Sequence, residues 1–163
     1  MIRPEMIDAV IGLLSDNRAD IGTLAKRITD SEEITDPNVV KVVFNEEGFA
    51  LYFSRSPIPY HRDLFSVEVL KRGSAEEKKS CTITSGLPDF RTSELFMFKH
   101  IGIYSYRRDV LLNLTAMKQS KLEETERLEQ LSALENNFRI KVKETVFETI
   151  GVDTPQDLER AEE

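Results

Sequence analysis

The sequence predicts an α/β fold in which helices pack against β-strands. Runs rich in β-branched residues alternate along the chain with helix patterns, in the order helix, strands, helices, strand, helix. This alternation is typical of a layered α/β domain. The 163 residues are enough for one domain with a buried core, and no linker divides them. We therefore expect a single domain over residues 1–163.

A helix is predicted to begin at Pro4, because proline is tolerated at the first helical position and the acid of Glu5 suits the helix dipole. Apolar residues then recur at helical spacing, namely Met6, Ile7, Val10, Ile11 and Leu14. A short strand follows in residues 23–28.

A β-hairpin is predicted in the next segment. Residues 36–38 read Asp-Pro-Asn, a turn signal, and residues 39–44 are rich in β-branched residues, as expected of a buried strand. Turn residues occupy 45–48, and residues 49–53 return as the second strand. Two prolines within residues 56–59 predict an extended loop, because each removes a backbone donor.

The middle of the chain carries the weakest pattern. Residues 71–80 are polar and charged, and we interpret residues 66–98 as a solvated loop insertion. Residues 99–106 are rich in strand-forming side chains and predict a strand. A short helix is predicted for residues 108–114.

The C-terminal part opens with a capping box. Ser120 at the N-cap and Glu123 three residues later predict a helix that runs to about Glu135. Residues 138–147 then predict a strand. A last helix is predicted after residues 151–155, with a threonine at its N-cap and a proline at its first position.

Composition excludes several classes of protein. The net charge of −7 argues against a nucleic-acid binder, which usually shows a basic surface. No apolar run approaches the ~20 residues of a membrane span. Cys81 is the single cysteine, which fits a reducing compartment, and the first residues do not resemble a signal peptide. We therefore expect a cytoplasmic protein without a membrane span.

Standard catalytic and metal-binding motifs are not found in the sequence. The seven glycines do not cluster into a phosphate-binding loop. Two histidines, His61 and His100, are too few for a zinc site by themselves. A Gly-x-Ser-x-Gly motif of the serine hydrolases does not occur.

Two local groups could bind a ligand. Arg55 follows a strand and precedes the proline loop, where it could hold an anion with two hydrogen bonds or simply pair with a surface carboxylate. His100, Gly102, Tyr104 and Tyr106 would share one face of their strand, because side chains alternate with period two. This face suits a polyhydroxylated ligand, and it equally suits a partly buried interface.

Acidic residues form two further candidates. The predicted helix from Ser120 places Glu126 and Glu129 opposite an apolar stripe, which predicts a solvated acidic face. Asp153 follows a strand and precedes a helix, a position where α/β proteins hold ligands and Mg²⁺. The alternative for Asp153 is hydrogen bonding to amides at the helix start. The apolar stripe consists of Leu128, Leu131 and Leu134.

Three segments stand out by their residues and by their order along the chain. They are Ala-Leu-Tyr-Phe-Ser-Arg-Ser-Pro-Ile-Pro at 50–59, Lys-His-Ile-Gly-Ile-Tyr at 99–104 and Gly-Val-Asp-Thr-Pro at 151–155. Together they resemble the 3-deoxy-manno-octulosonate (Kdo) cytidylyltransferases, the CMP-Kdo synthetases of lipopolysaccharide synthesis. Residues 38–44, 122–123 and 128–131 fit the same family, and the resemblance is weakest over residues 66–96.

The resemblance implies a nucleotidyltransferase-like fold, a three-layer α/β arrangement with helices on both faces of the sheet, usually in a homodimer. It implies transfer of CMP from CTP to Kdo with release of pyrophosphate and with Mg²⁺ as cofactor. Such chemistry depends mostly on positioning and charge neutralisation. By motif, Asp153 would hold Mg²⁺ and Arg55 would lie near the sugar carboxylate. The sugar acid itself would contact His100, Tyr104, Glu129 and Gln130.

In the family, a large portion that carries the nucleotide-binding loop precedes the helix matched at Pro4. The resemblance therefore implies that residues 1–163 correspond to the C-terminal sugar-binding and dimerisation part, so that the fold is N-terminally incomplete. We expect the chain alone to have little or no activity. Two alternatives stay open, namely activation of another acidic sugar such as sialic acid, and a non-catalytic dimerisation fragment.

Overall fold

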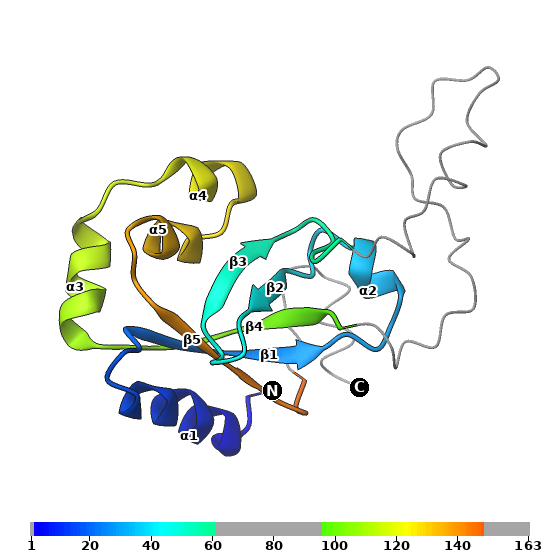
Figure 1. Ribbon diagram of the computed structural model, residues 1–163, viewed down its shortest axis with the longest axis horizontal. Helices are drawn as coiled ribbons and strands as arrows, with labels where there is room; N and C mark the ends of the chain where they lie inside the picture. The colour runs from blue at the N-terminus through cyan, green and yellow to red at the C-terminus, as the bar shows by residue number, and fades with distance from the viewer. Residues whose placement is uncertain (1, 61–95, 149–163) are drawn as a thin grey trace.

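The computed structural model describes residues 2–60 and 96–148, which form one five-stranded sheet with helices around it (Figure 1). The order of strands across the sheet is β3-β2-β4-β1-β5. The elements in chain order are α1 (Pro4–Gly12), a 3-10 turn η1 (Leu13–Ser15), β1 (Ile21–Arg27), α2 (Glu32–Thr35), β2 (Lys41–Phe44), β3 (Ala50–Ser54), β4 (Phe98–Tyr106), α3 (Arg108–Ala116), α4 (Lys121–Glu126), α5 (Gln130–Glu135) and β5 (Ile140–Glu144).

The sheet is mixed and curled. β1 runs antiparallel to β4 and parallel to β5, and β2 and β3 form the predicted antiparallel hairpin. Gly48 in the hairpin turn has a φ of 80°, a left-handed conformation that glycine adopts without strain. The turn reaches the opposite edge of the sheet, where the Val142 amide donates a hydrogen bond of 2.7 Å to the Gly48 carbonyl.

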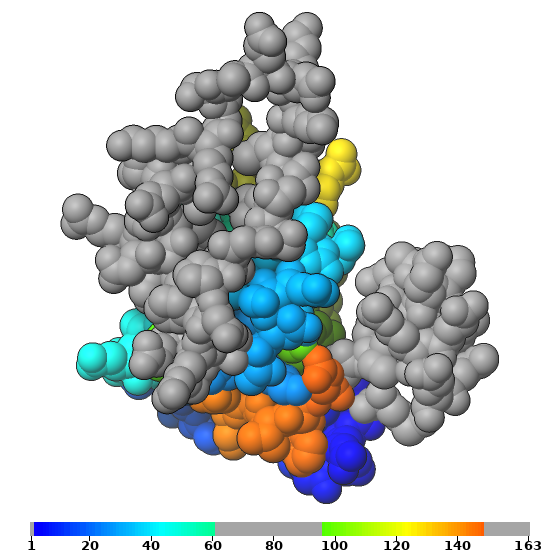
Figure 2. Space-filling view, turned by 90° about the vertical axis from the view of Figure 1, so that its right-hand side faces the viewer, coloured from blue at the N-terminus to red at the C-terminus, as the bar shows by residue number. Residues whose placement is uncertain are grey.

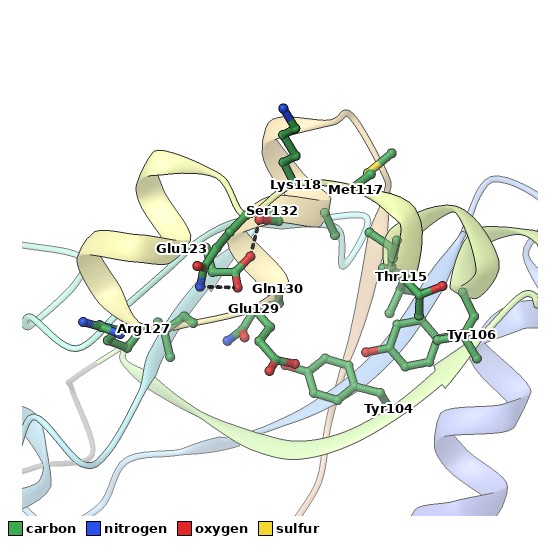
Figure 3. A pocket seen from close by; sticks show the side chains of 16 residues that line it. Tyr104, Tyr106, Thr115, Met117, Lys118, Glu123, Arg127, Glu129, Gln130 and Ser132 are labelled. Atoms are coloured by element: carbon green, nitrogen blue, oxygen red, sulfur yellow. Dashed lines mark hydrogen bonds between the residues drawn. The ribbon is translucent and has the colours of Figure 1, made fainter.

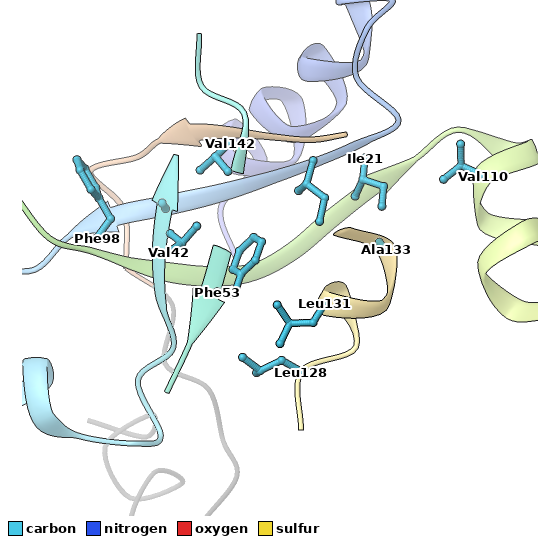
Figure 4. Close-up of a cluster of buried hydrophobic side chains, with 11 residues drawn as sticks. Ile21, Val42, Phe53, Phe98, Val110, Leu128, Leu131, Ala133 and Val142 are labelled. Atoms are coloured by element: carbon cyan, nitrogen blue, oxygen red, sulfur yellow. The ribbon is translucent and has the colours of Figure 1, made fainter. Parts of the chain in front are cut away.

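Helices cover both faces of this sheet, which confirms the predicted α/β class. On one face, Met6 and Val10 of α1 are buried against Leu24 and Ile101. On the other face, the β2–β3 hairpin and α5 enclose the larger cluster, drawn in Figure 4. That cluster contains Ile21, Ala25, Val42, Phe53, Phe98, Val110, Leu128, Leu131, Ala133, Ile140 and Val142.

Helix α1 begins at Pro4 as predicted, and only Met6 and Val10 of its regularly spaced apolar residues are buried. Ile7 and Ile11 lie on its outer side with 45% and 59% of their surface exposed. The start of α1 lies beside the last described residues of the chain, as Figure 2 shows, with the Arg3 guanidinium 5.2 Å from the centre of the Phe147 ring.

The single helix predicted from Ser120 to Glu135 is wrong, because the segment forms two helices, α4 and α5. Arg127 adopts a left-handed conformation with a φ of 56° and ends α4. The Ser120 hydroxyl does accept a hydrogen bond of 3.2 Å from the Glu123 amide, as the capping box requires. The Glu123 carboxylate, however, accepts from the Ser132 hydroxyl of α5, so it links the two helices.

Several predictions fall on residues outside the described ranges. They are the strand end and last helix around residues 151–155, including Asp153, and most of the 66–98 insertion, of which Phe98 already belongs to β4. Within residues 2–60 and 96–148, no helix has the length and apolar character needed to cross a bilayer.

Candidate functional site

A cleft of about 560 Å³ lies between strand β4, helix α3 and the turn that joins α4 to α5 (Figure 3). Tyr104 and Tyr106 point into it from β4, while Glu129 and Gln130 approach from the turn. Thr115 belongs to the wall formed by α3. The break between α4 and α5 builds this site, because it places Glu129 and Gln130 at the start of a new helix, above the strand.

Three aromatic rings follow one another along β4, which confirms the predicted shared face. The ring centres of His100 and Tyr104 are 5.2 Å apart, and those of Tyr104 and Tyr106 are 5.7 Å apart. His100 does not line the cleft itself but lies next to Tyr104 and packs edge-on against Phe53. The Tyr104 and Tyr106 rings form the floor of the cleft, and the His100 ring packs against Tyr104 from outside the cleft.

His100, Tyr104 and Tyr106 share one face although β4 has a bulge opposite Thr23 and Leu24 of β1. Thr23 pairs with Tyr104, whereas the next residue, Leu24, pairs with Ile101, so β4 contains two residues without partners on β1. Because this number is even, side chains on either side of the bulge keep the same alternation. One of the two residues is Gly102, which is exposed.

Both cleft tyrosines keep their protons. Burial raises the pKa of the Tyr104 phenol well above its usual value, and the neighbouring Tyr106 phenol and the Glu129 carboxylate raise it further. Burial and the charge of Glu129 also raise the pKa of Tyr106. The two hydroxyls can therefore donate hydrogen bonds, whereas the Glu129 carboxylate can accept them. Lys118 and Arg127 add positive charge to the cleft lining (Figure 3).

His100 is neutral at physiological pH because burial lowers its pKa to about 4. Its Nε2 atom lies 3.0 Å from the Thr23 hydroxyl oxygen. A neutral imidazole has one nitrogen that donates and one that accepts, so it can recognise a hydroxyl group.

The lowered pKa of His100 predicts a loss of stability in acid. Between about pH 6.5 and about pH 4 the unfolded chain binds a proton at this histidine that the folded chain does not bind. The free energy of unfolding should therefore fall as the pH drops through this window, by about 3 kcal/mol in total. Urea denaturation at several pH values measures the effect. In the variant His100→Gln this part of the slope should vanish, and an unchanged slope would contradict the assignment.

Arg55 ties three segments together by donating hydrogen bonds to backbone carbonyls. Its Nε atom donates to Glu126 at 2.8 Å, Nη1 to Pro37 at 2.8 Å and Nη2 to Arg127 at 3.4 Å. Three of the five N–H groups of a guanidinium are thus occupied. Arg55 does not line the cleft, and its predicted place near a ligand carboxylate stays a prediction.

The prediction of a solvated acidic face is wrong for Glu126. One of its carboxylate oxygens accepts a hydrogen bond of 2.6 Å from the buried Ser54 hydroxyl, and the other accepts one of 3.0 Å from the Arg55 amide. Because α4 ends after Glu126, this carboxylate turns toward the end of β3. Together with the Arg55 guanidinium it fixes the α4–α5 turn against the sheet.

Replacing Glu126 by alanine is expected to lower the free energy of unfolding by about 1–3 kcal/mol, because the Ser54 hydroxyl and the Arg55 amide lose their acceptor. Urea denaturation measures this difference. Glu124, which is exposed on the same helix, provides the matched control, and Glu124→Ala should change stability by less than about 0.5 kcal/mol. Equal losses in both variants would contradict a special role for Glu126.

Sequence reasoning missed several residues of the site. Thr115 of α3 and Met117, which follows α3, lie beyond residue 114, where the predicted helix ends. The Glu123–Ser132 contact depends on the break between α4 and α5, which the periodicity did not indicate. Thr23 did have a signal, because it is a polar residue inside the apolar run of β1, where it is fully buried.

The predicted site residues are brought together in part. Tyr104, Glu129 and Gln130 line one cleft, His100 supports it, Arg55 lies behind the turn, and Asp153 is outside the described ranges. Within the described ranges, no three His, Cys, Asp or Glu side chains come together as a metal site.

Comparison with known proteins supports the resemblance of the three motifs. A model of the cytidylyltransferase family matches residues 1–145. A 3-deoxy-manno-octulosonate cytidylyltransferase of Thermodesulfovibrio yellowstonii is 45% identical over 162 residues, which are 99% of this chain and 55% of that protein. The enzyme of the same name from Geobacter sulfurreducens is 46% identical over 98% of this chain and 58% of its own length.

A solved structure shows the same architecture. It is that of a CMP:2-keto-3-deoxy-manno-octonic acid synthetase complexed with CTP, which is 34% identical with a TM-score of 0.75 and is matched over 99% of this chain and 55% of its own. The chain spans about half the length of the curated relatives it matches. The family model, the relatives and the shared fold agree, and the chain belongs to the cytidylyltransferase family.

Proposed function

We propose that this chain binds the sugar acid in a Kdo cytidylyltransferase, which transfers CMP from CTP to Kdo and releases pyrophosphate. The observation that carries the proposal is that Tyr104 shares a cleft with Glu129 and Gln130, which lie in a different part of the sequence. All three residues were singled out by their motifs. The names of the relatives supply the reaction.

The chemistry of the cleft fits a polyhydroxylated acid. Hydroxyl groups of a sugar both donate and accept, and the cleft offers the Tyr104 and Tyr106 phenols as donors and Glu129 as an acceptor. Gln130 can do both. Lys118 or Arg127 supplies positive charge for the carboxylate of the ligand, and the predicted contact of Arg55 with this group is a further proposal.

Mg²⁺, CTP, a homodimer and a cytoplasmic location belong to the proposal through the resemblance. Asp153 is the proposed Mg²⁺ ligand, and residues 2–60 and 96–148 contain no cluster of three or more His, Cys, Asp or Glu side chains that could hold a metal ion. Because the chain spans about half the length of its relatives, we expect turnover only when the remaining part of the enzyme is supplied.

Isothermal titration calorimetry with the 163-residue chain tests the proposal. We expect Kdo to bind with one site per chain, and sialic acid, which is larger and carries an N-acetyl group, to bind at least tenfold more weakly. A neutral hexose serves as the control for non-specific binding. Failure of Kdo to bind, or equal binding of all three sugars, would overturn the proposal.

A further inference from the structure

We propose that Thr23 is a positioning residue that holds His100 as the Nε2–H tautomer and so fixes the ring against which Tyr104 packs in the floor of the cleft. The effect on ligand binding passes through Tyr104, because His100 does not line the cleft, and it rests on the proposed function. The part that concerns the tautomer rests on the geometry of the bulge between β1 and β4.

The Thr23 hydroxyl lies among three polar atoms of β4. Its oxygen is 2.8 Å from the carbonyl oxygen of Ile103, 3.3 Å from that of Ile101 and 3.0 Å from Nε2 of His100. Thr23 is fully buried. Ile101 precedes the two residues of β4 that have no partner on β1, and Ile103 is the second of them, so the hydroxyl takes the place of a missing ladder donor there.

The direction of the hydrogen bonds follows from the atoms involved. A carbonyl oxygen can only accept, and a threonine hydroxyl has one proton, which the nearer carbonyl of Ile103 receives. The contact with His100 must then run the other way, with Nε2–H donating to the Thr23 oxygen. In a neutral imidazole the second nitrogen, Nδ1, is consequently unprotonated.

The surroundings of His100 support a neutral ring with a fixed orientation. Burial lowers its pKa to about 4, so the ring carries a single proton at physiological pH. Phe53 packs edge-on against it, with ring centres 5.2 Å apart, and Tyr104 packs on another side at the same distance. Among residues 2–60 and 96–148, Nδ1 has no hydrogen-bond partner.

Nitrogen-15 NMR of the histidine side chains tests the tautomer without any ligand. The chain has two histidines, so the variant His61→Gln assigns the signals of His100. We expect one His100 nitrogen with the chemical shift of a protonated ring nitrogen and one with the shift of an unprotonated nitrogen. The couplings to the carbon-bound ring protons should assign the protonated nitrogen as Nε2. A His100 with Nδ1–H in the unmodified chain would overturn the inference, and this measurement does not depend on the folding of a variant.

Two substitutions separate positioning from a purely structural role. Thr23→Val keeps the shape and removes the hydroxyl, and we expect His100 to populate both tautomers and Kdo to bind about tenfold more weakly. Thr23→Ser keeps the hydroxyl and should restore the single tautomer and bring the affinity within threefold of that of the unmodified chain. An unchanged single tautomer in a folded Thr23→Val would overturn the inference.

The two proposals fail in different ways. If the tautomer behaves as expected and Kdo does not bind the unmodified chain, the proposed function is wrong and the positioning of His100 by Thr23 stands. If Kdo binds and Thr23→Val keeps full affinity, the sugar-binding proposal stands and the link between Thr23 and the ligand is wrong.

Discussion

Replacement of Gly22 by alanine is expected to lower the free energy of unfolding by about 3 kcal/mol, which corresponds to a fall of roughly 10 °C in the melting temperature. A Cβ atom on Gly22 would lie 2.6 Å from the Ser105 hydroxyl oxygen and 2.8 Å from the Val10 carbonyl oxygen. These two groups form the hydrogen bond of 2.6 Å that joins β4 to α1. The methyl group would break this bond and push α1 away from the sheet. Thermal denaturation followed by circular dichroism measures the change.

Gly102 provides the matched control, because it lies in the bulge of β4 and a Cβ atom there would meet no atom within 4 Å. Gly102→Ala should change the melting temperature by no more than about 2 °C. Similar losses in both variants would show that the packing of α1 described above is wrong.

Replacement of Glu129 by glutamine should weaken the binding of Kdo by 10- to 100-fold, with little change in stability. The exposed Glu129 carboxylate lines the cleft near the two tyrosine phenols and accepts hydrogen bonds from sugar hydroxyls in the proposed complex. Loss of hydrogen bonds to a charged group costs about 1.5–3 kcal/mol, which corresponds to a rise of roughly 10- to 100-fold in the dissociation constant. Calorimetric titration of both proteins gives the two dissociation constants.

The control for Glu129 is Glu124, which carries the same charge on α4 and lies outside the cleft lining. Glu124→Gln should leave the affinity within about twofold, although it changes the net charge equally. If both substitutions weaken binding to the same extent, general electrostatics and not a contact explains the loss.

Local patterns were sufficient for the strands and for the start of the first helix. The β-branched run in β2, the turn at Gly48 and the strand that follows predicted the hairpin, because each signal depends only on neighbouring residues. Pro4 likewise marked the start of α1. The alternation along β4 correctly placed His100, Tyr104 and Tyr106 on one face, and this held only because the bulge adds an even number of residues.

The helix break at Arg127 could not be predicted in the same way. Arginine is a good helix former, and its left-handed conformation is stabilised by contacts from distant segments, since Arg55 binds the carbonyls of Glu126 and Arg127. The role of Glu126 follows from the same long-range contact with Ser54. The spacing of residues along one helix predicts neither the conformation of Arg127 nor the contact of Glu126. The cleft could therefore be seen only in the tertiary structure, whereas the motifs had already identified several of its residues.

The most direct measurement of the sugar-binding site is an NMR titration of the labelled chain with Kdo, in which amide shifts are followed residue by residue. We predict that the largest changes fall on Tyr104, Tyr106, Glu129 and Gln130, and that they disappear in Glu129→Gln at the same sugar concentration. Changes confined to other parts of the chain, or a spectrum that Kdo leaves unaltered, would contradict the account.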